Sequence, residues 1–161
     1  MGDTKYAIRD PDFYIKMRGA HWDDESRGVA VILELTGMHP ISLTELSPES
    51  LRKEGPDRVL YWRRPKTNIT LQRSIPKKDV EIVEKFLVLR RKSYWHYWNL
   101  VRKLGQKAGY DALSPMTYRH QRCYTLMRNG AHPMEITHIM GCSLRVANRN
   151  YAKMKEWKDL D

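Results

Sequence analysis

The chain has 161 residues and a hydrophobic fraction of 41%, which suits one folded domain with a real core and argues against disorder. Its 29 basic and 19 acidic side chains give a formal net charge of +10, and nucleic acid is the polyanion that most often binds such a surface. No stretch approaches the ~20 apolar residues of a membrane span, and no signal peptide is evident. We therefore expect an intracellular protein, cytoplasmic or nucleoid-associated.

The sequence offers little for metal or redox chemistry. Its two cysteines, Cys123 and Cys142, are too few and too casually spaced for a disulfide framework or a zinc site. The histidines form no ligand pair of the HExxH kind. We expect two reduced thiols, no metal and no cofactor.

The first half of the chain predicts helices followed by a small sheet. Residues 1–19 carry mixed charge and predict an arm or a linker remnant. Residues 23–37 predict a helix, because acidic residues gather at its start, an apolar stripe runs through it and a glycine ends it. A short second helix is expected over 42–51. Two or three antiparallel strands with a basic hairpin are expected over 54–76.

The second half predicts helices throughout. Apolar residues return at helical spacing over 77–92, and further helices are expected over 93–110, 116–130, 132–142 and 143–161. The expected fold class is therefore α+β and mostly α, a helical bundle with a small antiparallel β-sheet near the first third.

The last two predicted helices meet at a glycine turn, which also fits a helix-turn-helix. Arg145 and Arg149 would then read the major groove of DNA. Many small helical domains show this pattern by chance, so plain packing is an equal alternative. A helix-turn-helix regulator would leave the Lys-Thr hairpin unexplained.

Four blocks of the chain, in order and at compatible spacing from about Trp22 to Tyr151, resemble the catalytic domain of tyrosine recombinases. These are the integrase-like site-specific recombinases, many of them encoded by mobile genetic elements. The family patterns are a "TGLR" block, a "KTxxxRxVP" hairpin, an "HxLRH…LLxxG" block and an "LGHxxxxxTxxY" block. In this chain they read "VILELTGMHPISLTEL", "RRPKTNITLQRSIP", "LSPMTYRHQRCYTLMRNG" and "EITHIMGCSLRVANRNY".

The resemblance implies DNA strand cleavage and rejoining through a 3′-phosphotyrosyl intermediate. Tyr151 falls at the nucleophile, nine residues after Cys142 as in the family. Arg119 falls at the second arginine, whose planar donor fork suits a phosphate. Lys66 falls at the hairpin lysine, which would give the leaving group its proton as general acid. Taken singly, Tyr151 could be a core tyrosine and Lys66 a solvated hairpin tip.

Three of the six expected catalytic positions hold other residues. His39 replaces the first arginine, Met116 the histidine that opens "HxLRH", and Cys142 the histidine or tryptophan after "LG". One missing donor of this kind weakens transition-state stabilisation by roughly 3–4 kcal/mol. His39 can donate one hydrogen bond and so replaces an arginine in part, whereas His120 matches a supporting histidine of the family and does not restore the missing one.

The departures leave two interpretations of the activity. The domain is either a diverged recombinase or a recombinase fold kept as a non-catalytic DNA-binding module. In both, double-stranded DNA is the partner, held by phosphate contacts that depend on salt. The candidate contacts are Arg63, Arg64, Arg73, His120, Arg122, Arg145 and Arg149.

The resemblance also suggests how the chain is divided. The recombinase-like domain would cover residues 20–152, followed by a tail over 153–161. Met154 and Trp157 in this tail could dock on a second copy and support self-association on DNA, or fold back on their own domain. The family's N-terminal core-binding domain would be missing, because Trp22 lies close to the start of the sequence.

Overall fold

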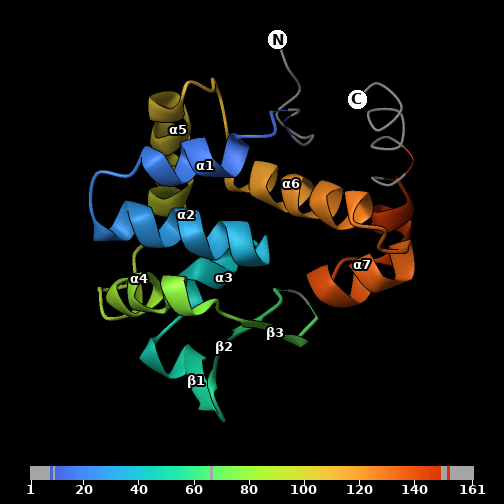
Figure 1. Ribbon diagram of the computed structural model, residues 1–161, viewed down its shortest axis with the longest axis horizontal. Helices are drawn as coiled ribbons and strands as arrows, with labels where there is room; N and C mark the ends of the chain where they lie inside the picture. The colour runs from blue at the N-terminus through green and yellow to red at the C-terminus, as the bar shows by residue number, and fades with distance from the viewer. Residues whose placement is uncertain (1–7, 9, 66, 150–151, 153–161) are drawn as a thin grey trace.

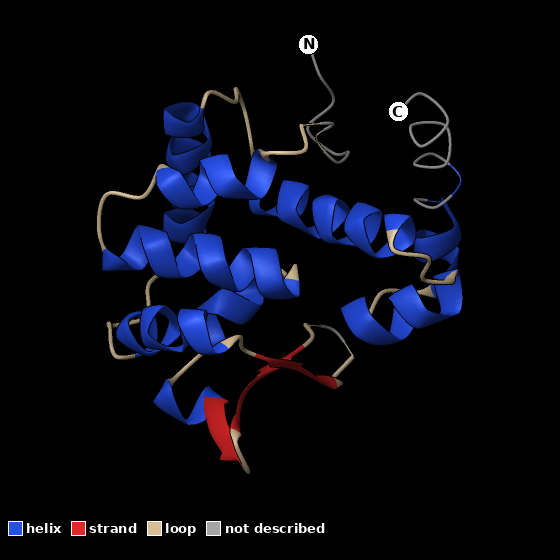
Figure 2. Ribbon diagram, viewed as in Figure 1, coloured by secondary structure: helices blue, strands red, loops and turns tan. Residues whose placement is uncertain are grey.

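The computed structural model shows a helical protein with one small sheet (Figures 1 and 2). It describes residues 8, 10–65, 67–149 and 152. A further helical segment covers residues 144–149. The elements in chain order are α1 (Phe13–Gly19), α2 (Asp24–Thr36), α3 (Pro40–Glu45), the 3-10 turn η1 (Pro48–Ser50), β1 (Leu51–Glu54), β2 (Asp57–Arg63), β3 (Thr70–Ser74), α4 (Lys77–Leu87), α5 (Tyr94–Ala108), α6 (Pro115–Arg128) and α7 (Pro133–Met140).

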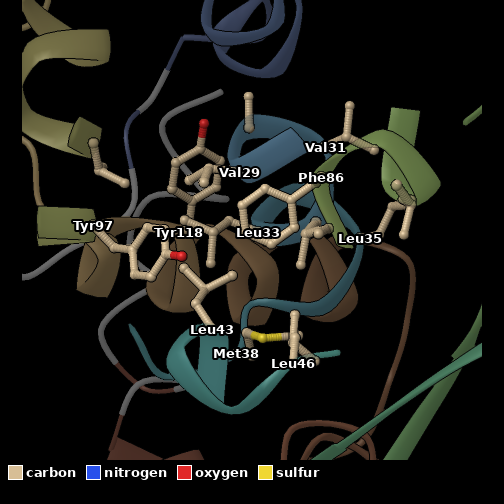
Figure 3. Close-up of a cluster of buried hydrophobic side chains, with 14 of the residues drawn as sticks. Val29, Val31, Leu33, Leu35, Met38, Leu43, Leu46, Phe86, Tyr97 and Tyr118 are labelled. Atoms are coloured by element: carbon tan, nitrogen blue, oxygen red, sulfur yellow. The ribbon is translucent and has the colours of Figure 1, made fainter. Parts of the chain in front are cut away.

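Helix α2 forms where the sequence predicts it and runs through the centre of the core. Asp23 and Ser26 form a capping box at its start, and Gly37 ends it in the left-handed conformation. Most of its residues are buried, and α1, α4, α5 and α6 all pack against it. Figure 3 shows Val29 and Leu33 of α2 among aromatic side chains brought by those neighbours.

Residues 1–19 were expected to form an arm or a linker remnant. Instead, residues 13–19 form α1 and belong to the core. Phe13 and Met17 are each only 1% exposed. Arg18 at the end of α1 forks between Glu34 on α2 and Asp79 on α4, with N–O distances of 2.6 and 2.7 Å. This bridge joins three helices, and it keeps a buried carboxylate paired.

The sheet is antiparallel in the order β1-β2-β3 and lies at the bottom of Figure 2. The short helix predicted over residues 42–51 is only partly present. Its first half is α3, its second half is the turn η1, and Leu51 already begins β1. Prolines at positions 40 and 48 each start a new turn, which divides the segment in two.

Four of the five helices predicted for the second half are confirmed as α4, α5, α6 and α7, and the α+β, mostly α fold class is confirmed with them. The fifth, over residues 143–161, lies largely outside the described residues, which show its helical segment 144–149. Helices α6 and α7 share a smaller core cluster with Ala147, built around Cys123, Met127 and Ile136. In the described part of the chain, no helix is long and apolar enough to cross a membrane.

The packing of α4 on α2 predicts an unusual response to Gly28→Ala. A Cβ on Gly28 would lie 2.4 Å from Cβ of Phe86, so the two helices would have to separate. We expect the free energy of unfolding to fall by about 1–3 kcal/mol, although alanine is the better helix former. Urea denaturation measures the difference.

Gly19→Ala is the matched control, because a Cβ at Gly19 meets nothing within 4 Å. It should leave the stability unchanged or raise it by up to about 1 kcal/mol. Equal stability of the Gly28→Ala protein and the wild-type chain would contradict the close helix contact.

Candidate functional site

One cavity of about 490 Å³ collects side chains from segments far apart in the sequence. It lies where the α2–α3 junction, the β2–β3 hairpin, α6 and the chain after α7 meet. Its walls are largely apolar and its polar groups are mostly cationic. The lining residues are His39, Ile41, Ser42, Trp62, Arg64, Pro65, Leu71, Met116, Arg119, His120, Cys123, Met140, Cys142, Val146 and Arg149.

His39 stands at the start of α3, directly after the turn that ends α2. Its Nδ1 accepts a hydrogen bond from the backbone N–H of Ile41 at 3.2 Å and so caps α3. An imidazole whose Nδ1 accepts carries its proton on Nε2. The cap therefore fixes the tautomer, with the proton of His39 on Nε2. The ring also stacks on Tyr94 of α5.

Arg119 is a cation of the cavity that helix α6 and a backbone hydrogen bond hold in place. Helix α6 begins with a capping box at Ser114, which sets Arg119 on its second turn. Its Nη1 donates to the carbonyl of Gly37 at 2.9 Å. Burial lowers the pKa of Arg119, and the charge of Arg64 lowers it further. A guanidinium stays protonated under these conditions, so the site holds a desolvated positive charge.

Met116 and Cys142 also lie in the cavity, at two of the three positions where the resemblance would place other side chains. Burial raises the pKa of the Cys142 thiol, and that of Cys123 is raised to about 12. Both sulfurs are therefore neutral thiols near pH 7. Cys142 therefore supplies only a weak S–H donor at the position where the family's imidazole or indole would donate strongly.

Arg64 and Arg149 add two more guanidinium groups to the lining. Arg64 follows β2, and its backbone N–H closes the hairpin on the carbonyl of Ile69 at 2.8 Å. No aspartate or glutamate is among the described lining residues. A concave site with cations and low-dielectric walls focuses positive potential and binds anions, phosphate diesters included.

The other predicted DNA contacts lie outside this cavity. Arg63 points from the exposed side of β2 and pairs with Glu45 at 2.7 Å. Arg73 and Arg122 approach each other in a second groove of about 520 Å³, and burial lowers the pKa of Arg122. Arg145 is exposed on the helical segment 144–149. Of the seven candidates, Arg64, His120 and Arg149 line the cavity.

Several positions of the site escaped sequence reasoning. Gly37 reads in the sequence as a helix stop, yet its carbonyl is also the anchor of Arg119. Trp62, Leu71 and Met140 form the apolar walls, and they look like ordinary core residues in the sequence. The strand pairing of Trp62 with Leu71 would have been the only available signal for this wall.

Four predicted positions lie outside the described residues: Lys66, Tyr151, Met154 and Trp157. Their neighbours in sequence are described in part, and Pro65 and Arg149 both line the cavity. Within the described ranges, no group of three or more potential metal ligands comes together.

The fold is that of known recombinases, although no family model and no curated protein matches the sequence. The XerA recombinase structure superposes with a TM-score of 0.75 and 18% identity, over 90% of this chain and 59% of that one. The XerH site-specific recombinase bound to its difH substrate superposes with a TM-score of 0.72 and 13% identity, over 91% of this chain and 49% of that one. The Tn1549 transposon integrase in complex with a circular intermediate DNA superposes with a TM-score of 0.71 and 17% identity, over 93% of this chain and 62% of that one.

These similarities cover nearly all of this chain but only about half to three fifths of the solved chains. At such low identity they establish architecture. The helices around α2, the three-stranded sheet and the cavity between them therefore form a tyrosine-recombinase catalytic-domain fold.

Proposed function

We propose that this chain binds double-stranded DNA and cleaves it by site-specific recombinase chemistry, with the scissile phosphate in the cavity. The observation that carries the proposal is the convergence of four separate segments. His39, Arg119 and Cys142 occupy one site at the positions that the family resemblance assigns to phosphate ligands. The absence of acidic side chains among the described lining residues supports an anionic substrate.

In this mechanism Tyr151 attacks the phosphodiester, forming a 3′-phosphotyrosyl bond and releasing a 5′-hydroxyl. Lys66 gives its proton to the departing 5′-oxygen. Arg119, anchored on Gly37, holds a non-bridging phosphate oxygen, and Nε2–H of His39 donates to the other. Rejoining reverses these steps with a 5′-hydroxyl of another strand.

Arg64 fits the role of the second guanidinium. The position expected for the first arginine holds His39, but Arg64 enters the same cavity from the hairpin. Its charge acts on both Arg119 and Cys142, which supports a role for Arg64 beside the proposed phosphate. Arg64 thus offers the directed positive charge that His39 lacks when its imidazole is neutral.

A non-catalytic DNA-binding module is the second candidate. Met116 and the neutral thiol of Cys142 favour it, because neither donates a strong hydrogen bond to a developing phosphorane charge. A helix-turn-helix regulator is less well supported, since Arg149 lines the cavity beside Arg119.

Covalent trapping separates cleavage from binding. The substrates are a randomised set of duplexes with single nicks. After cleavage beside a nick, the short fragment that carries the new 5′-hydroxyl diffuses away, so the phosphotyrosyl adduct cannot be rejoined and accumulates. We expect an adduct with the wild-type chain and none with Tyr151→Phe. Arg64→Met should lower the adduct rate at least about 100-fold, the cost of losing one such donor.

His39→Arg is the informative partner variant, because it restores the residue of the family pattern. Faster trapping is expected. If His39→Arg binds duplex DNA normally and still forms no adduct, the chain is a binding module and the cleavage proposal is wrong.

Salt dependence tests whether Arg119 contacts a phosphate. The logarithm of the binding constant falls with the logarithm of salt concentration by about 0.9 per neutralised phosphate. Arg119→Met should weaken duplex binding and reduce this slope by about 1. Fluorescence anisotropy between 50 and 200 mM salt, on the order of physiological strength, measures it.

Arg63→Met is the control, because Arg63 is exposed and already paired with Glu45. It should change the slope far less. An equal reduction of the salt slope in both variants would indicate that the phosphates bind on the outer face of the sheet, and would contradict phosphate binding in the cavity.

A further inference from the structure

Helix α5 carries aromatic rings that continue from His39 in the cavity wall to the exposed Trp95. Tyr94 stacks on His39 with ring centroids 6.3 Å apart and an interplanar angle of 25°. Trp95 meets Tyr94 edge-on at 5.1 Å, and Trp98 lies 6.3 Å from Trp95. We call His39, Tyr94, Trp95 and Trp98 the aromatic row.

Trp95 is the unusual member, because 65% of its surface is exposed. Packing does not account for it, since α5 faces the core with Tyr97, Leu100 and Leu104. Large aromatic side chains left in water commonly mark a binding surface. The T-shaped contact with Tyr94 holds the indole, so one of its surfaces is presented to a ligand with little further ordering.

The charge around the row indicates a polyanion. Residues 88–103 contain five basic and no acidic side chains. The guanidinium of Arg102 lies 6.0 Å from the ring centre of Trp98, and Arg90 is exposed. No carboxylate in the described part of the chain pairs with either arginine. An apolar protein partner would leave these guanidiniums unpaired, and a basic partner would meet the same charge.

We propose that the aromatic row stacks unpaired DNA bases next to the scissile phosphate. This inference rests on the proposed function. Because His39 lines the cavity together with Arg119 and also begins the row, the row leads from the proposed phosphate site toward Trp95. Aromatic rings beside cations bind single strands through base stacking, which a paired duplex does not offer.

Strand exchange supplies such bases. Once the 5′-hydroxyl is released, the nucleotides behind it must leave their complementary strand before they reach a new partner. The row would hold them beside the cavity during that transfer, and thereby lower the cost of unpairing. Trp95 and Trp98 are binding residues in this scheme and take no part in the bond-making steps.

The test compares two duplexes of the same sequence, one fully paired and one with three central unpaired nucleotides, on the non-cleaving Tyr151→Phe chain. Anisotropy should show about 5- to 100-fold tighter binding to the unpaired duplex, the size of one stacking contact. Trp95→Ala should abolish this preference and leave the affinity for the paired duplex within about twofold. Trp95→Phe should retain part of it.

Trp22→Ala is the matched control, since Trp22 also lies beside lysines of α5 but outside the row, and it should keep the full preference. Absence of a preference in the parent chain, or equal weakening of both duplexes by Trp95→Ala, would overturn the proposal. These results are separable from the cleavage assay. A chain that forms the Tyr151 adduct without the preference overturns the aromatic row alone. The preference without an adduct contradicts cleavage alone.

Discussion

The left-handed turn at Gly37 is the constraint on which both the core and the cavity depend. It ends the most buried helix at a φ of +59°, and a Cβ there would lie 2.9 Å from Cβ of Arg122 and 3.3 Å from Met140. Conformation and space therefore both require glycine. The same turn directs the chain into His39, and its carbonyl holds Arg119. One backbone position thus fixes two groups of the candidate site.

The electrostatics at this end of α2 explain how buried arginines that pair with no carboxylate in the described part of the chain are tolerated. The negative end of the helix dipole faces Arg119 and Arg122, and it offsets part of their desolvation. Arg18 shows the contrasting arrangement, because Glu34 and Asp79 neutralise it and raise its pKa. Burial lowers the pKa of Arg119 and Arg122. Arg18 is thus satisfied within the fold, whereas Arg119 retains the capacity to bind an external anion.

Sequence reasoning predicted the elements whose signals are local. The α2 helix has a capping residue, an apolar stripe and a glycine stop, so its predicted range of 23–37 lies within one residue of the observed helix at each end. Strand β1 was missed because Leu51 is its only buried residue, and its partner on β2 rather than its own pattern holds it. Helix α1 was missed because only Phe13 and Met17 mark its buried side within a run of mixed charge.

The residues of the candidate site likewise fall into those that a local motif predicts and those that only long-range contacts decide. The resemblance located His39 and Arg119 by their motifs, but it could not separate Arg64 from Arg63. Successive residues of a strand point to opposite sides, so one of the two must leave the cavity. Which one does so is decided by the pairing of Trp62 with Leu71 and by the bond between Glu45 and Arg63. Such long-range contacts are absent from a single sequence.

The substituted positions bear on cleavage more than on binding. Met116 and Cys142 stand where the resemblance places directed hydrogen-bond donors, and they take away no permanent charge. His39 stands in place of an arginine and does remove one, while Arg64, Arg119 and Arg149 remain. Affinity for a phosphate diester depends mainly on net charge, which the ground state and the transition state share. Rate depends on donors aimed at the charge that develops only in the transition state. Under the proposed function, the guanidinium groups of the cavity hold DNA, and the substituted positions alter the donors that would distinguish a cleaving site from a binding one.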